Sequence, residues 1–435
     1  MEEDILRIQP TIEPNTSIIK IIGVGGGGGN AVCQMFREGI PEVRFLVCNT
    51  DEKALVDSIV PTRIQLGPGL GAGGKPELGR QYAEESIDQI DKIFDADTKM
   101  VFITAGMGGG TGTGASPVIA REARKHGVLT IGVVTIPFLF EQRKQIDKAL
   151  DGLDELSQHV DAMLVINNER LREIYPSLDI LNAFKKADET LSTAVRSIVE
   201  IITMHGTIGL DFRDVNNVLR NGGVAIMSSG IADGEGRVTK AIEKALYSPL
   251  VNNNDIYRAR RLIFAITTSG VGNDILRMEE LQEIHNFTAR FHTDVETKWG
   301  LVTDDAMGKS IKITILASGF KIYEKPGDAT SDKLQNVLDD EARRSRREHN
   351  YPELAKDKNG HRIRKRPRTF LYDICNLDDE ELTEKIERTP TALRGYDELV
   401  EICELASRHA RQPEEDPAPA EEQSVKTIRF DVDPS

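Results

Sequence analysis

The stretch GMGGGTGTGASP, residues 106–117, places six glycines and two threonines between an apolar run and a segment with helical character. A glycine in regular structure costs about 0.5–1 kcal/mol relative to alanine, so this density requires a reason. Glycines let backbone N–H groups approach an anion closely, and the N-terminus of a following helix adds a favourable dipole. We interpret the stretch as a phosphate-binding loop rather than a tight turn, with the helix beginning near Pro117.

Short apolar runs alternate with longer helical patterns between Ile18 and Glu169. The runs are rich in Val and Ile and are bounded by Gly, Pro or Asn, which is typical of parallel strands buried on both faces. The expected strands are residues 18–24, 44–50, 100–106, 129–137 and 162–168. The alternation predicts a doubly wound, Rossmann-like α/β domain, in which ligands bind at the carboxyl ends of the strands. The glycine clusters follow these ends.

Two further glycine clusters accompany the first. GVGGGGGNAV, residues 23–32, follows a strand and opens the predicted helical segment NAVCQMFREG, residues 30–39. Asp51 lies about 20 residues further on, as the dinucleotide-binding fingerprint expects. GLGAGGKPELG, residues 69–79, approaches a P-loop, but Pro76 stands where that motif needs a hydroxyl for magnesium. Two phosphate loops at neighbouring strand ends can hold more phosphate than a pyrophosphate.

Charge and cysteine content exclude several classes of protein. The formal net charge of −15 over 435 residues argues against a nucleic-acid-binding protein, because neutralising phosphates needs clustered Lys and Arg. The acidic start MEEDILRIQP lacks the features of a secretory signal, and no apolar run is long enough to span a membrane, so we expect a cytoplasmic protein. The four cysteines form no zinc or disulfide pattern, and we assign no metal-ligating residue.

Taken together, the motifs resemble the FtsZ family, the bacterial tubulin-like GTPases of cell division. The motifs that stand in the family's order, close to its spacing, are GVGGGGGNAV, NTD (49–51), GLGAG (69–73), GMGGGTGTGASP, TIPFLFE (135–141) and DFRD (211–214). The resemblance covers roughly residues 17–320. It implies a flexible extension at 1–16, a GTP-binding domain at 17–178, a central helix at 179–206, a smaller α+β domain at 207–320 and a largely disordered tail at 321–435.

Guanine recognition is expected from the central helix. Residues 179–205 carry a helical stripe of apolar side chains, and Phe184 and Asp188 are four positions apart, so they share a face. On that face a ring can stack on a base, while a carboxylate accepts from the N1–H and N2–H₂ groups of guanine. Periodicity alone favours a core position and a surface position for these two residues. The resemblance assigns both to the base.

The resemblance also implies the rest of the nucleotide site. Glu141 is expected to hold the ribose. The complete set of further residues expected at GTP or GDP is Gly25, Gly26, Gly27, Gly28, Gly29, Asn30, Gly73, Gly109, Gly110, Thr111, Gly112, Thr135, Gln145 and Asn168. Mg²⁺ is the implied cation, and K⁺ is a further candidate.

Catalysis needs more than a phosphate cradle, because phosphoryl transfer requires an oriented water and charge stabilisation. No acid in the glycine loops supplies them. By resemblance, Asp211 and Asp214 enter the nucleotide site of the next subunit and polarise the attacking water. Assembly into a head-to-tail homopolymer would complete the active site, and hydrolysis would weaken the contact. The same two acids also suit an ordinary helix N-terminus.

Three departures from the family pattern bear on turnover. Gly209 stands where the family usually has Asn, two residues before the first catalytic Asp. Gln142 replaces the usual Gly and Gln145 replaces a basic residue, although Arg143 is near enough in sequence to substitute. The loop IQLGPG is shortened. Slow hydrolysis or altered nucleotide affinity follows as an alternative.

The second domain is expected to be mixed α/β. Its helices are predicted at 237–249 and 279–292, and its strands at 261–269 and 310–319. No independent catalytic cluster is evident in this region.

Beyond Phe320 the sequence becomes polar. A basic stretch at 341–369 precedes acidic blocks, which predicts a largely disordered tail with short helices that acts mainly as a solvated spacer. Weak contact of the basic segment with an anionic membrane or nucleic acid is the alternative. TPTALRGY (389–396) resembles the family's adaptor-binding peptide, and KTIRFDVDPS (426–435) alternates like a strand-adding peptide. Either motif would dock on a membrane-anchoring or regulatory division protein, without membrane insertion by the chain itself.

The sequence therefore predicts a GTPase that polymerises into filaments of the cytokinetic ring at midcell. Two alternatives stay open. A GTP-binding filament scaffold with little hydrolysis would explain Gly209 and Gln145. A nicotinamide-dependent oxidoreductase would explain Asp51 and the first glycine cluster, but it leaves GGGTGTG and Asp188 without a role.

Overall fold

The structure is a computed structural model, and it describes residues 17–204, 206–247, 256–270, 275–291 and 295–320, with residues 346, 347, 349–351, 382, 384, 385, 388 and 402 of the tail. The chain divides into two compact units. The first comprises Met1–Glu324 with Arg343–Ala355, and the second comprises Lys325–Ala342 with Lys356–Ser435. The predicted extension at 1–16 and the motifs at 389–396 and 426–435 lie outside the described residues.

Six parallel strands form the sheet of the first domain, in the order β3-β2-β1-β4-β5-β6. They are β1 (Ile19–Val24), β2 (Val43–Asn49), β3 (Thr62–Gln65), β4 (Met100–Gly106), β5 (Leu129–Ile136) and β6 (Ala162–Asn167). The five predicted strands are confirmed, and β3 is added at the edge. The helices are α1 (Gly25–Glu38), α2 (Glu52–Val56), α3 (Pro76–Glu85), α4 (Ile87–Asp91), α5 (Thr111–Lys125), α6 (Arg143–Ser157) and α7 (Asn168–Ile174), with the 3₁₀ turn η1 (Leu139–Glu141).

Alternate residues of the parallel strands face two separate cores. Ile19 and Ile21 of β1 pack with α1 and with the long helix α8 (Ile180–Thr203). Ile22 and Val24 of the same strand pack with α3, α4, α5 and α6. Both faces of the sheet are therefore covered by helices, which confirms the doubly wound architecture.

The second domain extends the same sheet through β6 and β8, which pair at only two positions, Ala162–Gly223 and Met163–Val224. The strand order continues β8-β11-β9-β10-β7 and is mixed in direction. Its elements are β7 (Gly206–Ile208), α9 (Phe212–Leu219), β8 (Gly223–Ala232), α10 (Arg237–Leu246), η2 (Ile256–Arg258), β9 (Arg261–Thr268), α11 (Met278–Thr288), β10 (Glu296–Thr303), η4 (Asp305–Met307) and β11 (Ile311–Phe320). The two predicted helices and two predicted strands are present.

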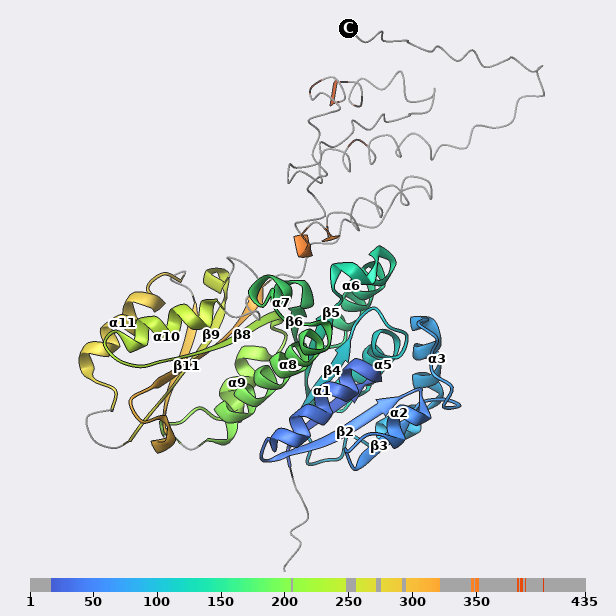
Figure 1. Cartoon of the computed structure of the whole chain (residues 1–435), viewed down its shortest axis with the longest axis horizontal. Helices are drawn as coiled ribbons and strands as arrows, with labels where there is room; N and C mark the ends of the chain where they lie inside the picture. The colour runs from blue at the N-terminus through green and yellow to red at the C-terminus, as the bar shows by residue number, and fades with distance from the viewer. Residues whose placement is uncertain are drawn as a thin grey trace, which may run out of the picture. The chain divides into compact units, whose positions relative to one another are not determined.

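Helix α8 runs between the two lobes of this unit (Figure 1). Its buried residues Leu191, Val195 and Ile198 belong to one core that also contains Met227 of β8 and Leu316 of β11. The predicted central helix is thus confirmed as the element whose packing joins both domains. None of the helices in the described ranges is long and apolar enough to cross a bilayer.

Two helices begin earlier than the sequence predicts. Helix α5 starts at Thr111 rather than near Pro117, which lies inside it. Helix α1 starts at Gly25, within the glycine run. The expectation failed because glycine disfavours helix, whereas here close packing requires it: a Cβ on Gly114 would lie 1.9 Å from the Pro76 carbonyl oxygen of α3.

Candidate nucleotide site

The three glycine clusters meet at the carboxyl ends of the parallel strands. A Cβ on Gly25 would lie 2.8 Å from the backbone nitrogen of Gly112, so the first and third clusters touch. A Cβ on Gly110 would lie 2.9 Å from the backbone nitrogen of Lys75, which brings in the second cluster. The backbones approach too closely at these points for any side chain.

Two helix N-termini open into this meeting point without a side-chain cap. The residue before α1 is Val24 and the residue before α5 is Gly110, and neither helix has an acid in its first turn. Helices α2, α7, α8 and α9, by contrast, are capped by Asp or Asn side chains. The first N–H groups of a helix need acceptors, and a phosphate supplies them with the favourable dipole. The arrangement suits an anion.

The candidate glycines divide by what surrounds them. A Cβ on Gly26, Gly29, Gly73 or Gly109 would meet nothing within 4 Å, so the backbone there is open to a ligand. Gly28 is different, since its Cβ would lie 2.1 Å from the Thr104 carbonyl oxygen. Part of the glycine pattern therefore serves packing, as it does at Gly110 and Gly112.

A cavity of about 470 Å³ adjoins the first glycine cluster, between α1, β2, α2 and α8. Its lining includes Gly26, Gly29, Asn30 and Asp188, which the sequence predicted at the base and phosphates. Lys185, which sequence reasoning missed, also lines it; its position between Phe184 and Asp188 on α8 was the available signal.

Asp188 is electrostatically poised for a ligand that donates hydrogen bonds. Burial raises the pKa of its carboxyl from 3.8 to about 7. Desolvation disfavours a carboxylate, and hydrogen bonds to the charged form favour it. A pair of N–H donors such as those of guanine would therefore restore the ionised form.

The side chain of Asn168, the first residue of α7, is a second polar group available to a ligand. Its side chain is 5% exposed, and its Oδ1 atom has no hydrogen-bond partner among the described residues. Buried acceptors are rarely left unpaired in native proteins. A hydroxyl or N–H of a bound nucleotide would satisfy it.

Aromatic side chains border the same region. Phe184 is 42% exposed, and its ring meets that of Phe138 edge-on, with centroids 5.3 Å apart. Phe138 stacks on Phe140 at 5.2 Å. The Phe138 N–H donates to Glu141 Oε1 at 2.9 Å, so one oxygen of that carboxylate holds the loop. Phe184 keeps exposed ring surface for a base.

The remaining candidates lie under the loops or beside them. The Thr111 hydroxyl hydrogen-bonds the Thr50 hydroxyl at 2.6 Å. The Thr135 carbonyl accepts from Met107 N at 2.9 Å. A Cβ on Gly108 would lie 3.0 Å from the Gln145 carbonyl oxygen, so Gln145 sits against the third cluster.

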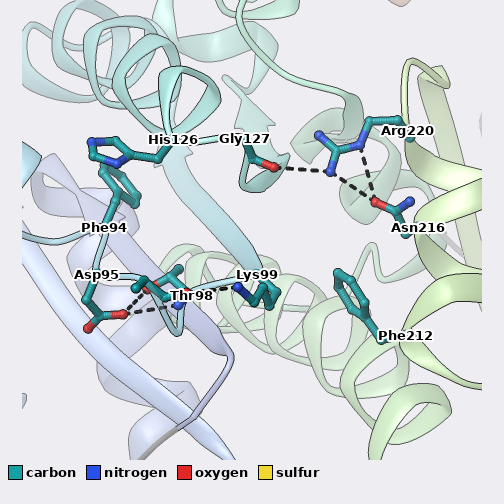
Figure 2. A pocket seen from close by; sticks show the side chains of 10 residues that line it. Phe94, Asp95, Thr98, Lys99, His126, Gly127, Phe212, Asn216 and Arg220 are labelled. Carbon is teal, nitrogen blue, oxygen red and sulfur yellow. Dashed lines mark hydrogen bonds between the residues drawn. The ribbon is translucent and has the colours of Figure 1, made fainter.

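Asp211 and Asp214 lie toward the amino ends of the parallel strands, whereas the glycine loops lie at the carboxyl ends. They cap α9: Asp214 N donates to Asp211 Oδ1 at 3.0 Å, and Asp211 N donates to Asp214 Oδ2 at 3.2 Å. Asn216 of α9 and Arg220, which follows the helix, line a cavity of about 530 Å³ with Gly127 and Lys99, at the amino ends of β5 and β4 (Figure 2). Strand β4 is 7 residues long, so the amino and carboxyl ends of the parallel strands are about 20 Å apart. These acids do not reach the glycine loops of their own chain.

The departures from the family pattern also have structural consequences. Gln142 adopts φ 76° and ψ 150°, a conformation that favours glycine and costs about 1–3 kcal/mol otherwise. A Cβ on Gly209 would meet nothing within 4 Å, so a polar side chain would fit there.

A group of potential metal ligands, not predicted from the sequence, lies far from the glycine loops. Ligand atoms of Asp91, Glu122 and His126 lie within 4.8 Å of one another. His126 Nε2 contacts Asp91 Oδ1 at 2.7 Å, and Lys125 Nζ contacts Glu122 Oε2 at 2.8 Å. A hydrogen bond and an ion pair account for this cluster.

Fold and site together define a phosphate- and base-binding α/β protein with a second domain joined through a central helix. Residues 18–176 match the model of the Tubulin/FtsZ family, GTPase domain, and residues 223–321 match that of the FtsZ family, C-terminal domain. The chain belongs to the FtsZ family and is a tubulin-type GTPase. The resemblance stated from the motifs is confirmed, and the oxidoreductase alternative is wrong.

Several relatives cover most of the chain. "Cell division protein FtsZ" of Porphyromonas gingivalis is 51% identical over 346 residues, 78% of this chain and 75% of that protein. The protein of the same name in Aquifex aeolicus is 44% identical over 312 residues, 70% of this chain and 84% of that protein. Among solved structures, an FtsZ dimer of M. jannaschii is 35% identical with a TM-score of 0.63, covering 72% of this chain and 95% of that one. CetZ2 of Haloferax volcanii, 19% identical with a TM-score of 0.60 over 76% of this chain and 99% of that one, shares the fold.

Proposed function

We propose that this GTPase polymerises head to tail and that each subunit contact completes one active site. The observation that carries the proposal is the separation of Asp211 and Asp214 from the glycine loops by the full length of the strands. In a head-to-tail stack, the amino-end edge of one subunit faces the carboxyl-end edge of the next, and such a heterologous contact repeats into a filament. The dimer known for an FtsZ of M. jannaschii supports self-association.

Within each subunit, the nucleotide would be held from three sides. The open backbone at Gly26, Gly29 and Gly109 and the two uncapped helix N-termini would bind the phosphates. Asp188 would accept from guanine and Phe184 would stack on it, while Asn168 and Glu141 would bind the ribose side. The other sequence-predicted residues would shape the loops.

Cations would be held largely by the substrate. Mg²⁺ keeps several waters and binds few protein carboxylates besides substrate phosphates. The first and third glycine clusters contain no carboxylate, and the carboxylate of the second, Glu77, lies in the first turn of α3, which fits a magnesium ion held by phosphate oxygens and water. K⁺ is proposed as a second cation of the same phosphate region.

For hydrolysis, Asp211 and Asp214 of one subunit would orient and polarise the water that attacks the terminal phosphate held by its neighbour. Loss of that phosphate would remove the charge that both subunits share, and the contact would weaken. The filament would act in cell division, as the names of the relatives indicate. We place it in the cytoplasm at the division site, bound through its tail to membrane-anchoring and regulatory division proteins.

A mixing experiment tests the shared site. Asp211→Ala damages only the donated acid, and Asp188→Asn damages only the nucleotide pocket. Mixed in equal amounts, the two variants pair an intact pocket with an intact acid at up to about a quarter of contacts. At a GTP concentration too low to fill the weakened Asp188→Asn pocket, we expect the mixture to hydrolyse GTP faster than the sum of the two variants measured separately. Activity of the mixture equal to the sum of the separate variants would contradict sharing.

A filament scaffold with little hydrolysis is the second candidate. It is favoured by Gly209, which offers no polar side chain beside the predicted water, and by the strained Gln142. Turnover of the wild-type chain separates the two, since nucleotide binding would be the same in both.

A further inference from the structure

A short helical turn of the tail is docked on the GTPase domain. Arg346 pairs with Asp151 at 3.3 Å and with Asp154, and Arg347 pairs with Asp147 at 3.1 Å. The three aspartates occupy positions i, i+4 and i+7 of α6, so they form one acidic stripe along the helix. Part of the basic stretch predicted as a solvated spacer therefore has an intramolecular partner.

Tyr351 anchors this turn. Its side chain is 1% exposed and belongs to the core formed with α3, α4, α5 and α6. Its hydroxyl donates to the Pro137 carbonyl at 2.6 Å. Burial and the nearby carboxylates of Glu169 and Glu141 raise the pKa of the hydroxyl, so it stays protonated and remains a donor. The contact is made where β5 ends and the Phe138–Glu141 loop begins.

A second contact reaches the start of α7. Asn167 Nδ2 donates to the Asn350 carbonyl at 2.6 Å, while Asn167 Oδ1 accepts from Glu169 N at 3.0 Å. Glu169 Oε2 in turn accepts from Leu139 N at 2.9 Å. The tail thus ends a chain of hydrogen bonds that joins α7 to the loop after β5.

Both contacted loops carry nucleotide-site residues. The loop after β5 holds Glu141 and the Phe138 ring that meets Phe184. The start of α7 holds Asn168, whose buried Oδ1 has no partner among the described residues. Fixing these loops in advance removes an ordering cost from ligand binding.

We propose that Arg346, Arg347 and residues 349–351 form a positioning strap, which holds the loop after β5 and the start of α7 in the nucleotide-binding geometry and thereby slows nucleotide release. The strap residues touch neither phosphate nor base, and act through Pro137 and Asn167. The proposal rests on the nucleotide site assigned above. It makes the tail a regulator of nucleotide exchange, since any partner that pulls the strap away would speed release.

The test compares three full-length proteins with wild type. Arg346→Glu with Arg347→Glu reverses the strap charge, and Tyr351→Phe removes only the buried hydroxyl. Lys92→Glu with Lys240→Glu makes the same charge change at exposed residues elsewhere. The measurements are amide hydrogen exchange at Leu139 and Glu169 without nucleotide, and the release rate of a fluorescent GDP.

We expect exchange at both amides and GDP release to rise about tenfold in the charge reversal and about threefold in Tyr351→Phe, as losing one or two hydrogen bonds implies. The lysine control stays at wild-type values. Adding Asp147→Arg, Asp151→Arg and Asp154→Arg to the charge reversal restores the opposite charges of all three pairs and hence slow release, which general destabilisation would not. The GTP concentration for half-maximal hydrolysis rises more than the maximal rate changes.

Unchanged exchange at Leu139 and Glu169 in the charge reversal overturns the strap, as does faster exchange with unchanged GDP release. Failure of the nucleotide assignment is recognised separately. In that case GDP release would be insensitive to Asp188→Asn in the wild-type background, whereas hydrogen exchange reports the loop contact without any nucleotide.

Discussion

Replacing Asp188 by Asn should stabilise the nucleotide-free protein and weaken its binding of GTP. The carboxyl pKa rises from 3.8 in the unfolded chain to about 7 in the fold because the group is buried. A rise of about three pKa units, at about 1.36 kcal/mol each, sets an upper limit of about 4 kcal/mol on the cost of keeping this carboxyl ionised in the fold. Because the group is partly solvated, the expected cost is about 1–3 kcal/mol. Asparagine carries no charge and avoids this cost.

The raised pKa of Asp188 determines how the stability of the wild-type fold changes with pH. Between the unfolded pKa and about 7, the folded state binds more protons than the unfolded state, so stability falls as pH rises through that window. Above about pH 7, the folded protein carries the full cost of burying the ionised Asp188 carboxylate. Asp188→Asn should therefore melt at the wild-type temperature near pH 4 and at a temperature higher by about 2–4 °C per kcal/mol at pH 8.

Asp188→Asn should weaken GTP binding although it stabilises the nucleotide-free fold. Hydrogen bonds to a charged acceptor contribute about 1.5–3 kcal/mol, so Asp188→Asn should weaken GTP affinity at pH 8 about tenfold or more. Thermal melts without nucleotide and equilibrium titrations with GTP measure the two effects. Asp57→Asn is the matched control, because Asp57 is an exposed acid on the same cavity wall. A stabilisation that does not change with pH would show that the Asp188 carboxylate carries no burial penalty, and undiminished GTP affinity would show that it does not bind the base.

Three further predictions follow from backbone geometry. Gln142→Gly relieves the unfavourable φ and should raise the free energy of unfolding by about 1 kcal/mol; denaturant titration would show the opposite if the residue were unstrained. Gly209→Asn enters open space and should leave the melting temperature unchanged while raising the maximal GTP hydrolysis rate; an unchanged rate would mean that a polar group there is not limiting. Gly114→Ala should destabilise the fold by about 1–3 kcal/mol, because its Cβ collides with α3, whereas Gly109→Ala should fold normally and bind GTP less tightly. Equal melting temperatures for these two alanine variants would contradict the division between packing and ligand-facing glycines.

Much of the fold was predictable because the parallel strands are continuous Val- and Ile-rich runs. The strands that escaped notice lack that signal. Strand β3 has four residues and lies at the sheet edge, β10 carries exposed polar residues, and β8 is interrupted by Gly and Ser. Helix starts were misplaced because propensity argues against glycine, while backbone-to-backbone packing, which only the folded chain reveals, demands it.

In the nucleotide site, the spacing of residues along the sequence was enough to predict which side chains lie together when they belong to a single helix. Phe184 and Asp188 share a helix face, and the structure brings Asp188 into the cavity with Gly26 and Asn30. Contacts distant in sequence were not predictable. Tyr351 docks against Pro137 across more than 200 residues, and the i, i+4, i+7 aspartates of α6 were the one local sign of a basic partner.

In the proposed mechanism, one subunit supplies the acid for the hydrolysis of its neighbour's GTP. The most direct measurement is phosphate release from GTP against protein concentration, with magnesium and potassium present, for wild type and Asp211→Asn. Asparagine retains an N-cap acceptor for Asp214 N, so the helix start is preserved while the charge is lost. We predict that wild-type specific activity rises steeply above a threshold concentration and that the variant is slower by at least about a hundredfold. Specific activity independent of concentration and equal in both proteins would contradict the claim.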